Sequence, residues 1–248
     1  MSEATPLLEV RNLSKNFGPV QALSDLTMHV GAGEVVALAG DNGAGKTTLI
    51  KAISGVYRPS SGSVRLEGKE VSFSSPQEAR ERGIETIYQD LALADNLSIG
   101  ANIFLGREPM TKKFGFLPVL DRKKMAQAAQ ETMALLDFHV SRMDAPVSNF
   151  SGGQRQAVAI GRAVYWNARV LIMDEPTAAL GVPEQRKVIS LIKQLKAQGR
   201  GVIFISHNLQ DIFAVSDRIV VLRRGVMAGE RRIADTTHDE VVKLMIGG

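Results

Sequence analysis

Short apolar runs alternate along most of the chain with longer stretches that have helical periodicity. The runs are rich in β-branched residues, which is typical of strands that a sheet buries on both faces. They lie at residues 35–39, 84–88, 170–173, 202–205 and 218–222. The last run leads to a glycine, which indicates a hairpin. This alternation predicts an α/β fold with a mostly parallel sheet.

Strands of another kind are predicted near the N-terminus. Residues 7–17 and 26–30 alternate apolar and polar side chains, and residues 63–73 carry a central glycine. Alternation with period two is expected of strands that have one exposed face. These segments predict a small antiparallel sheet beside the main sheet.

Helices are expected where good helix formers lie between start and stop signals. Residues 46–55 follow a glycine-rich turn, and residues 183–198 have a proline near their start and a glycine just past their end. Residues 121–138 favour a helix throughout, and residues 154–166 follow a pair of glycines. Residues 91–150 therefore interrupt the strand–helix alternation and are expected to form a mostly helical insert.

The sequence GDNGAGKTT at residues 40–48 fits the phosphate-binding pattern G-x-x-x-x-G-K-[ST] and lies between a predicted strand and a predicted helix. Its glycines let backbone N–H groups turn toward phosphates, and the helix N-terminus adds partial positive charge. Lys46 is expected to reach the β- and γ-phosphates, and Thr47 to provide a Mg²⁺ ligand. The predicted nucleotide-binding residues here are Gly40, Asp41, Asn42, Gly43, Ala44, Gly45, Lys46, Thr47 and Thr48.

Two further motifs carry charge or glycine at the ends of predicted elements. Asp174 and Glu175 end an apolar strand, where Asp174 would lie beside Mg²⁺ and Glu175 could polarise a water molecule. Residues 151–154, with the sequence SGGQ, precede a predicted helix and form a helix N-terminus that can receive an anion. Taken alone, SGGQ could also be a simple turn and helix cap.

The ordered set of phosphate loop, SGGQ, VLIMDEPTAAL at residues 170–180 and His207 resembles the nucleotide-binding subunits of ATP-binding-cassette (ABC) transporters. The resemblance extends over essentially the whole chain. It implies a P-loop NTPase fold: a RecA-like, mostly parallel sheet, an N-terminal antiparallel β subdomain and an inserted α-helical subdomain. It predicts one nucleotide-binding domain over residues 1–248, with the ATP-binding core in 1–90 and 160–248 and the helical subdomain in 91–159.

The resemblance also implies roles for single residues. Glu175 resembles the catalytic base, His207 the switch histidine at the γ-phosphate, and Gln89 the glutamine that senses Mg²⁺ and the attacking water. Phe17 matches the aromatic residue that stacks on adenine. Ser151 and Gly153 match signature residues that reach the γ-phosphate bound on an opposite subunit. The implied ATP-binding set outside the phosphate loop is Phe17, Ser151, Gly152, Gly153 and Gln154, and the implied Mg²⁺ set is Thr47, Gln89 and Asp174.

Shorter strings narrow the expected substrate. GVYRPSSG at residues 55–62, FLGRE at 104–108 and AALG at 178–181 resemble ATPases of bacterial importers for monosaccharides of the ribose, xylose, galactose and fructose type. The resemblance predicts a single-cassette ATPase that works with transmembrane permease subunits, a second copy of itself in a head-to-tail dimer and, indirectly, a periplasmic sugar-binding protein. An ABC ATPase for amino acids, lipids or ions remains an alternative. An ABC ATPase not linked to transport, or a phosphate-loop kinase, is less favoured.

Composition and charge limit the remaining classes. The chain has 248 residues, of which 44% are hydrophobic and 23% charged, so general disorder is excluded. A formal charge of +4 suits an anionic ligand, but without a long basic face it predicts no nucleic-acid partner. The chain contains no cysteine, which excludes disulfides and thiolate metal sites. With neither a signal sequence nor an apolar run of about 18 residues, the expected location is cytoplasmic, peripheral on the inner face of the cell membrane.

Overall fold

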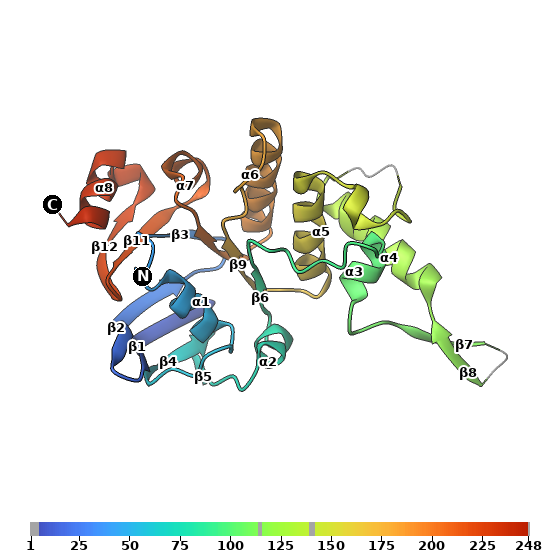
Figure 1. The fold of residues 1–248 in the computed structure, drawn as a ribbon, viewed down its shortest axis with the longest axis horizontal. Coiled ribbons are helices and arrows are strands. Elements are labelled where there is room, and N and C mark those ends of the chain that lie inside the picture. The colour runs from blue at the N-terminus through green and yellow to red at the C-terminus, as the bar shows by residue number, and fades with distance from the viewer. Residues whose placement is uncertain (1–4, 114–115, 139–141, 248) are drawn as a thin grey trace. The chain divides into compact units, whose positions relative to one another are not determined.

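The computed structural model describes residues 5–113, 116–138 and 142–247 (Figure 1). The chain divides into two compact units. One, here called the sheet unit, comprises residues 1–89, 168–177 and 192–248. The other, the helical unit, comprises residues 90–167 and 178–191.

The main sheet of the sheet unit is mostly parallel, as the apolar runs predicted. Its strand order is β12-β11-β3-β10-β9-β6, and β12 at the edge is antiparallel to β11. Parallel neighbours are in register at their carboxyl ends, where Ile205 of β10 lies beside Leu38 of β3 and Asp174 of β9. The bounds are β3 (Val35–Ala39), β6 (Ile84–Ile87), β9 (Val170–Asp174), β10 (Gly201–Ile205), β11 (Arg218–Arg223) and β12 (Val226–Arg232).

A second, antiparallel sheet follows the order β2-β1-β4-β5, which confirms the predicted N-terminal sheet. Its strands are β1 (Leu8–Phe17), β2 (Val20–Val30), β4 (Ser61–Leu66) and β5 (Lys69–Val71). Strand β2 begins earlier than the alternation suggested. The predicted segment 63–73 is divided into two strands because Glu67 and Gly68 turn the chain with positive φ values of 48° and 77°.

One hydrophobic core joins both sheets with helix α1 (Lys46–Ile53), which buries Leu49, Ile50, Ala52 and Ile53. Side chains from β1 and β2, such as Leu8 and Leu26, belong to the same cluster as Ile203 of β10 and Leu222 of β11. The remaining helical segments described in this unit are α2 (Pro76–Glu81), α7 (Leu209–Val215), α8 (His238–Ile246), the short 3-10 turn Ile233–Asp235 and the last part of α6 (Val182–Ala197), from residue 192 on. Burial on both sides of the main sheet explains why its strands read as continuous apolar runs.

A buried arginine ties the strands of the sheet unit together at one end. The Arg218 guanidinium donates to Glu34 Oε1 at 2.9 Å, to Glu230 Oε1 at 2.7 Å and to the carbonyl of His29 at 2.6 Å. Burial alone would raise the pKa of Glu34, but the hydrogen bond from Arg218 and the N–H of Gly31 hold that pKa below its usual value. The charge is thus paired on every side, as a buried charge must be.

The helical unit is built from α3 (Ile99–Phe104), α4 (Arg122–Leu135), α5 (Gly152–Tyr165), the 3-10 turn Val147–Asn149 and the first part of α6 (Val182–Ala197). It also contains a two-stranded hairpin of β7 (Met110–Lys113) and β8 (Leu117–Leu120), which the sequence patterns did not predict. In the described part of the chain, no helix is both long and apolar enough to cross a membrane.

Local chemistry sets the helix ends within a few residues of the prediction. Helix α4 is shorter than the predicted 121–138, because the Asp121 carboxylate caps its start by accepting from the N–H of Lys124 at 3.0 Å. At its other end Asp137 has a positive φ of 51°, which a helix interior does not allow. Helix α5 begins earlier than predicted because Ser151 and Gln154 form a reciprocal capping box.

The polar side chain of Asn102 in α3 is completely buried in the helical unit. Its Oδ1 accepts from the N–H of Ala94 at 2.7 Å, and its Nδ2 donates to the carbonyls of Ala94 at 3.1 Å and Ser98 at 3.1 Å. The amide therefore holds the chain before α3 against that helix. Removing it would leave the part-buried N–H of Ala94 without this partner, whereas the carbonyls of Ala94 and Ser98 would keep their backbone donors.

We expect Asn102→Ala to lower the free energy of unfolding by about 1–3 kcal/mol, because one unsatisfied buried group, here the N–H of Ala94, costs about that much. Urea denaturation followed by circular dichroism measures the change. The control Asn149→Ala replaces an exposed amide of the same unit and should change stability by less than about 0.5 kcal/mol. Equal stability of the two variants would contradict the role given to Asn102.

Candidate functional site

The loop between β3 and α1 can follow its path only with glycine at two positions. Gly40 has a φ of 144°, and a Cβ added there would lie 2.3 Å from the carbonyl oxygen of Leu222. Gly45 has a φ of 106°, and its added Cβ would lie 2.8 Å from the Leu23 side chain. The loop thus passes tightly between the ends of β11 and β2. The sequence pattern predicts that these glycines let backbone N–H groups turn toward phosphates, and the structure adds this packing requirement.

The turn between β11 and β12 supports the loop from outside. The N–H of Gly225 donates to the carbonyl of Ala44 at 3.0 Å, and the carbonyl of Gly225 accepts from the N–H of Ser24 at 2.8 Å. Within the loop, the N–H of Ala44 donates to the carbonyl of Asp41 at 3.1 Å. The loop is therefore fastened through its backbone to the β11–β12 turn, and that turn is itself bonded to β2.

Helix α1 begins directly behind the loop, and no side chain caps its N-terminus, because the N-cap residue is Gly45. The N–H groups of its first turn are not capped by a side chain, so this end is suited to receive an anion. Lys46 curls back over the loop, where Nζ donates to the carbonyls of Gly40 at 2.5 Å and Asp41 at 3.0 Å. Burial lowers the pKa of Lys46, while the negative charges of Glu175, Asp174 and Asp41 oppose that shift.

Two carboxylates face this lysine from the end of β9. Burial raises the pKa of Asp174, the charge of Glu175 raises it further, and Lys46 lowers it. Glu175 has a positive φ of 51°, which is rare for a residue with a long side chain, and its N–H donates to the carbonyl of Ile205 at 2.9 Å. The neighbouring strand thus holds Glu175 in a strained conformation, as is common at functional sites.

His207, which follows β10, is paired with Glu175. Its Nδ1 lies 2.8 Å from Oε1 of the carboxylate. The Glu175 side chain is 16% exposed, whereas that of His207 is 77% exposed. The carboxylate thus lies mostly within the site, and the imidazole borders it from the solvent side with Nε2 left for another partner.

A cavity of about 930 Å³ brings most of the predicted residues together, all of them in the sheet unit. It is lined by the whole loop from Gly40 to Thr48 and by Gln89, Asp174, Glu175 and His207. Residues that sequence reasoning missed also line it, namely Val20, Gln21, Ala22, Arg224, Gly225 and Met245. The hairpin glycine was a signal for the turn that contains Arg224, but no sequence signal pointed to Met245.

Phe17 and the SGGQ residues are not among the residues that line this cavity. Phe17 is 42% exposed and contacts Tyr57 edge to face with 5.1 Å between ring centroids. Ser151, Gly152, Gly153 and Gln154 belong to the helical unit, at the start of α5. There Oγ of Ser151 accepts from the N–H of Gln154 at 3.4 Å.

The donors present suit a magnesium ion that a nucleotide brings with it. Among the described residues, no group of three or more His, Asp or Glu side chains is arranged to hold a metal. Thr47, Gln89 and Asp174 line one cavity and offer a hydroxyl, an amide oxygen and a carboxylate. Mg²⁺ takes few protein oxygens and completes its shell with phosphate and water, so this set fits an ion held jointly with phosphates.

Known proteins resemble this chain over nearly its full length. A relative named xylose/arabinose import ATP-binding protein XylG, from Sulfolobus acidocaldarius, is 49% identical over 96% of this chain and 93% of its own. Fructose import ATP-binding protein FrcA of Rhizobium meliloti is 44% identical over 98% of this chain and 94% of its own. Ribose import ATP-binding protein RbsA 1 of Rubrobacter xylanophilus is 44% identical, but the match spans only 47% of that protein.

Solved structures share the fold. The ADP conformation of MJ1267, an ATP-binding cassette of an ABC transporter, superposes with a TM-score of 0.82 at 26% identity and covers 98% of this chain and 99% of that one. A nucleotide-free ATP-binding cassette gives a TM-score of 0.81 at 25% identity, over 98% and 96% of the two chains. Together with the sheet order, these confirm the predicted P-loop NTPase fold with an antiparallel sheet and added helices.

The family model described as ABC transporter matches residues 23–178. The matched segment includes the phosphate loop and Asp174, and it covers more than half of the chain. The chain therefore belongs to the ABC transporter family.

Proposed function

We propose that this chain is the ATP-hydrolysing subunit of an importer for a monosaccharide. The observation that carries the proposal is the single cavity in which the phosphate loop faces the Glu175–His207 pair. This cavity unites a site for a polyphosphate with a carboxylate that can take a proton. ATP hydrolysis needs both.

Binding of ATP rests on the loop and on α1. Backbone N–H groups of the loop and of the uncapped α1 N-terminus point at the phosphates, and Lys46 is released from the carbonyls of Gly40 and Asp41 to contact them. Thr47, Asp174 and Gln89 would hold Mg²⁺, which when bound neutralises charge on the β- and γ-phosphates. Phe17 would stack on adenine, beside a cavity whose lining includes Val20.

In the hydrolysis step, Glu175 acts as the general base. Its carboxylate would accept a proton from water as the oxygen of that water bonds to the γ-phosphorus. The bond from the γ-phosphorus to the bridging oxygen breaks, and ADP leaves with that electron pair. With both ring nitrogens protonated, His207 would donate from Nδ1 to Glu175 and from Nε2 to a γ-phosphate oxygen. The strained backbone of Glu175 fixes the carboxylate for this task.

Transport requires other chains. The relatives named for xylose/arabinose and fructose import match this chain over more than nine-tenths of both lengths, which supports a monosaccharide as the cargo. We propose that permease subunits dock near Gln89, that a periplasmic protein delivers the sugar, and that the chain acts at the inner face of the membrane. A second copy of the chain would place its Ser151–Gln154 segment on the γ-phosphate. ATP would then bind more tightly to the closed pair of subunits than to the open pair, and this difference would close the pair and drive the permease.

We expect Glu175→Gln to keep ATP affinity and to lose about 10²- to 10⁴-fold in hydrolysis rate, because an amide cannot accept the proton. Phosphate release under saturating MgATP measures the rate, and fluorescent nucleotide titration measures the affinity. Glu131→Gln, which changes an exposed acid of α4 outside the cavity, is the control. Hydrolysis at the wild-type rate in Glu175→Gln would exclude this residue as the base.

We expect Lys46→Ala to weaken ATP binding about 10- to 100-fold, since a hydrogen bond between charged groups contributes about 1.5–3 kcal/mol. Isothermal titration with a non-hydrolysable ATP analogue measures the affinity. Lys51→Ala removes the same side chain further along α1 and should bind nucleotide as the wild type does. Unchanged affinity in Lys46→Ala would show that the nucleotide binds elsewhere.

We expect the chain to co-purify with a co-expressed permease of a monosaccharide importer, and a monosaccharide with its binding protein to stimulate ATP hydrolysis in proteoliposomes several-fold. Monosaccharides and amino acids, each with a matching binding protein, are compared in the same assay. Stimulation by an amino acid alone would assign a different cargo to the subunit. It would leave the ATPase proposal intact.

A further inference from the structure

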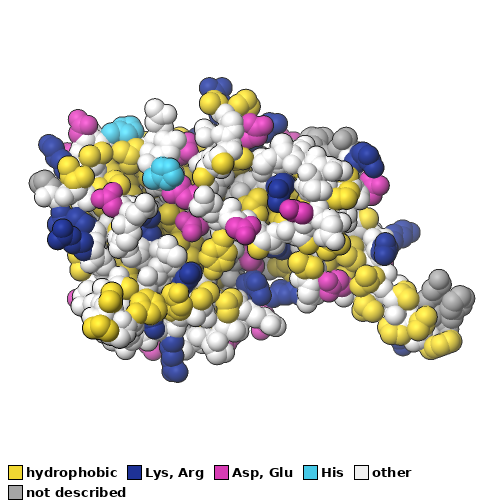
Figure 2. All heavy atoms as spheres, in the orientation of Figure 1, with side chains coloured by type: hydrophobic (Ala, Val, Ile, Leu, Met, Phe, Trp, Pro, Cys, Tyr) yellow, Lys and Arg dark blue, Asp and Glu magenta, His cyan; other side chains and the backbone are white. Residues whose placement is uncertain are grey.

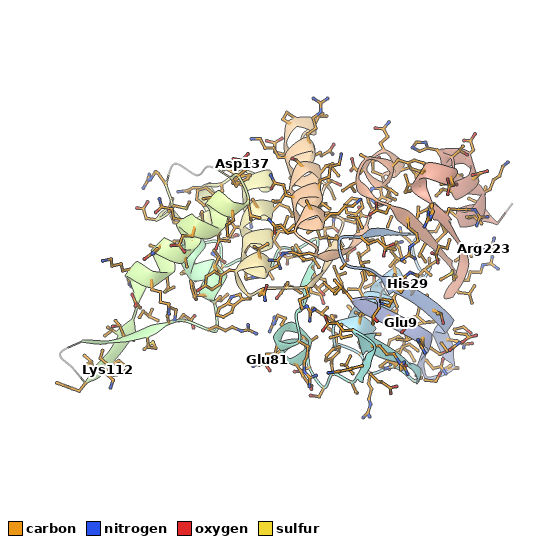
Figure 3. The ribbon with its side chains drawn as sticks, turned by 180° about the vertical axis from the view of Figure 1, so that it is seen from behind. Glu9, His29, Glu81, Lys112, Asp137 and Arg223 are labelled. Carbon is orange, nitrogen blue, oxygen red and sulfur yellow. The ribbon has the colours of Figure 1, made fainter. Side chains whose placement is uncertain are left out.

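The β7–β8 hairpin extends from the helical unit beyond helices α3, α4 and α5 (Figure 1). Its strands pair in antiparallel register, with Met110 opposite Leu120 and Lys113 opposite Leu117. The hairpin is closed at its base, where the N–H of Asp121 donates to the carbonyl of Pro109 at 2.8 Å. Lys112 lies far out on it, away from those three helices (Figure 3).

Large apolar side chains of the hairpin are exposed to solvent. Met110 is 57% exposed, Phe116 79%, Leu117 48% and Leu120 44%. Hydrophobic side chains gather at this extension on the face shown in Figure 2. An isolated two-stranded hairpin is only marginally stable in water, so exposing this much apolar surface on one points to a partner that covers it.

These apolar side chains lie on both faces of the hairpin. Side chains alternate along a strand, so Met110 and its partner Leu120 project to one face, while Leu117 projects to the other. A hairpin that docks on a protein surface buries one face and leaves the other polar. Apolar groups on both faces suit immersion in an apolar medium.

The positive charge of the protein is concentrated in the same segment. Residues 105–124 contain six lysines and arginines and two acids, so their formal charge of +4 equals that of the whole chain. The other 228 residues carry equal numbers of basic and acidic residues. Both acids of the segment have local partners: Glu108 accepts from the N–H of Gly106 at 3.0 Å, and Asp121 caps α4.

Three of the basic residues occupy a position that helix stability does not favour. Arg122, Lys123 and Lys124 are exposed in the first turn of α4, beside the base of the hairpin. The N-terminal end of a helix is partially positive, so cations there oppose the helix dipole. Their charge therefore serves something other than the fold, and an anionic surface would be complementary to it.

We propose that the hairpin surface, defined by Met110, Lys112, Phe116, Leu117, Leu120, Arg122, Lys123 and Lys124, binds directly to an anionic lipid bilayer. The apolar side chains enter the boundary between headgroups and acyl chains, and the basic residues lie at the charged headgroups. This combination of apolar insertion and cationic attraction is what holds peripheral segments on membranes. The contact needs neither nucleotide nor permease and goes beyond the proposed ATPase function.

Flotation of the full-length chain with protein-free vesicles tests the proposal. We expect binding to vesicles of phosphatidylcholine with 30% phosphatidylglycerol (a composition of about this proportion suffices for a negative surface) and little binding to pure phosphatidylcholine. Binding should weaken in 0.5 M salt, because the Debye length is shorter than at low salt and the attraction between basic side chains and headgroups is screened. The same outcome is expected with and without ATP.

Two variants separate the contribution of the basic side chains to vesicle binding from that of the apolar side chains. Replacing Arg122, Lys123 and Lys124 together by glutamine should lower vesicle affinity about 100-fold, at roughly fivefold per charge. Phe116→Ser with Leu117→Ser should lower it at least about tenfold. Matched controls are the triple replacement of exposed Arg186, Lys187 and Lys193 of α6 by glutamine, and Leu135→Ser at the far end of α4.

Several outcomes would overturn the proposal. They are failure to float with anionic vesicles, equal loss in the α6 control, and association only with vesicles that contain the permease. The last outcome would assign the hairpin surface to a protein partner. ATP hydrolysis, measured in parallel, should be the same in both hairpin variants as in the wild type, so failure of this proposal leaves the proposed ATPase function untouched.

Discussion

The parallel register of β3, β10 and β9 is the constraint on which the site depends. Because Leu38, Ile205 and Asp174 lie side by side, the residues that follow each strand emerge at one edge of the sheet. The phosphate loop follows β3, Glu175 follows β9 and His207 follows β10. Hydrogen bonds of the ladder and burial on both faces of the sheet hold these strand ends, so segments far apart in sequence meet within one cavity.

Burial at this edge of the sheet shifts the pKa values of the charged side chains. Lys46 and Asp174 are both half-buried. Burial lowers the pKa of Lys46 and raises the pKa of Asp174, because it disfavours the charged form of each group, and the opposite charge of the neighbour opposes each shift. Without a ligand, Lys46 uses the carbonyls of Gly40 and Asp41 as partners. A polyphosphate offers the same ammonium group stronger acceptors, so the proposed nucleotide binding would exchange internal hydrogen bonds for charge-assisted ones.

The helical unit shows a different use of polar groups. Inside it, the Asn102 amide satisfies buried backbone groups and so specifies how the chain enters α3. Outside it, the basic residues of α4 oppose the helix dipole, and the hairpin exposes Phe116 and Leu117. The interior Asn102 amide is paired for stability, whereas the outer surface departs from what stability alone would favour. Such departures are where interaction surfaces are expected.

Local motifs were enough to predict the parallel sheet, the antiparallel sheet and the loop from Gly40 to Thr48, because strand periodicity and glycine-rich turns act over a few neighbouring residues. Helix ends were predicted less well, since capping by Asp121 and Ser151 depends on side-chain geometry. The pairing of Glu175 with His207, the support of the loop by Gly225 and the place of Met245 in the cavity were decided by the tertiary structure alone. Each joins segments that are distant along the chain, and a local pattern carries no information about which distant backbone groups will meet.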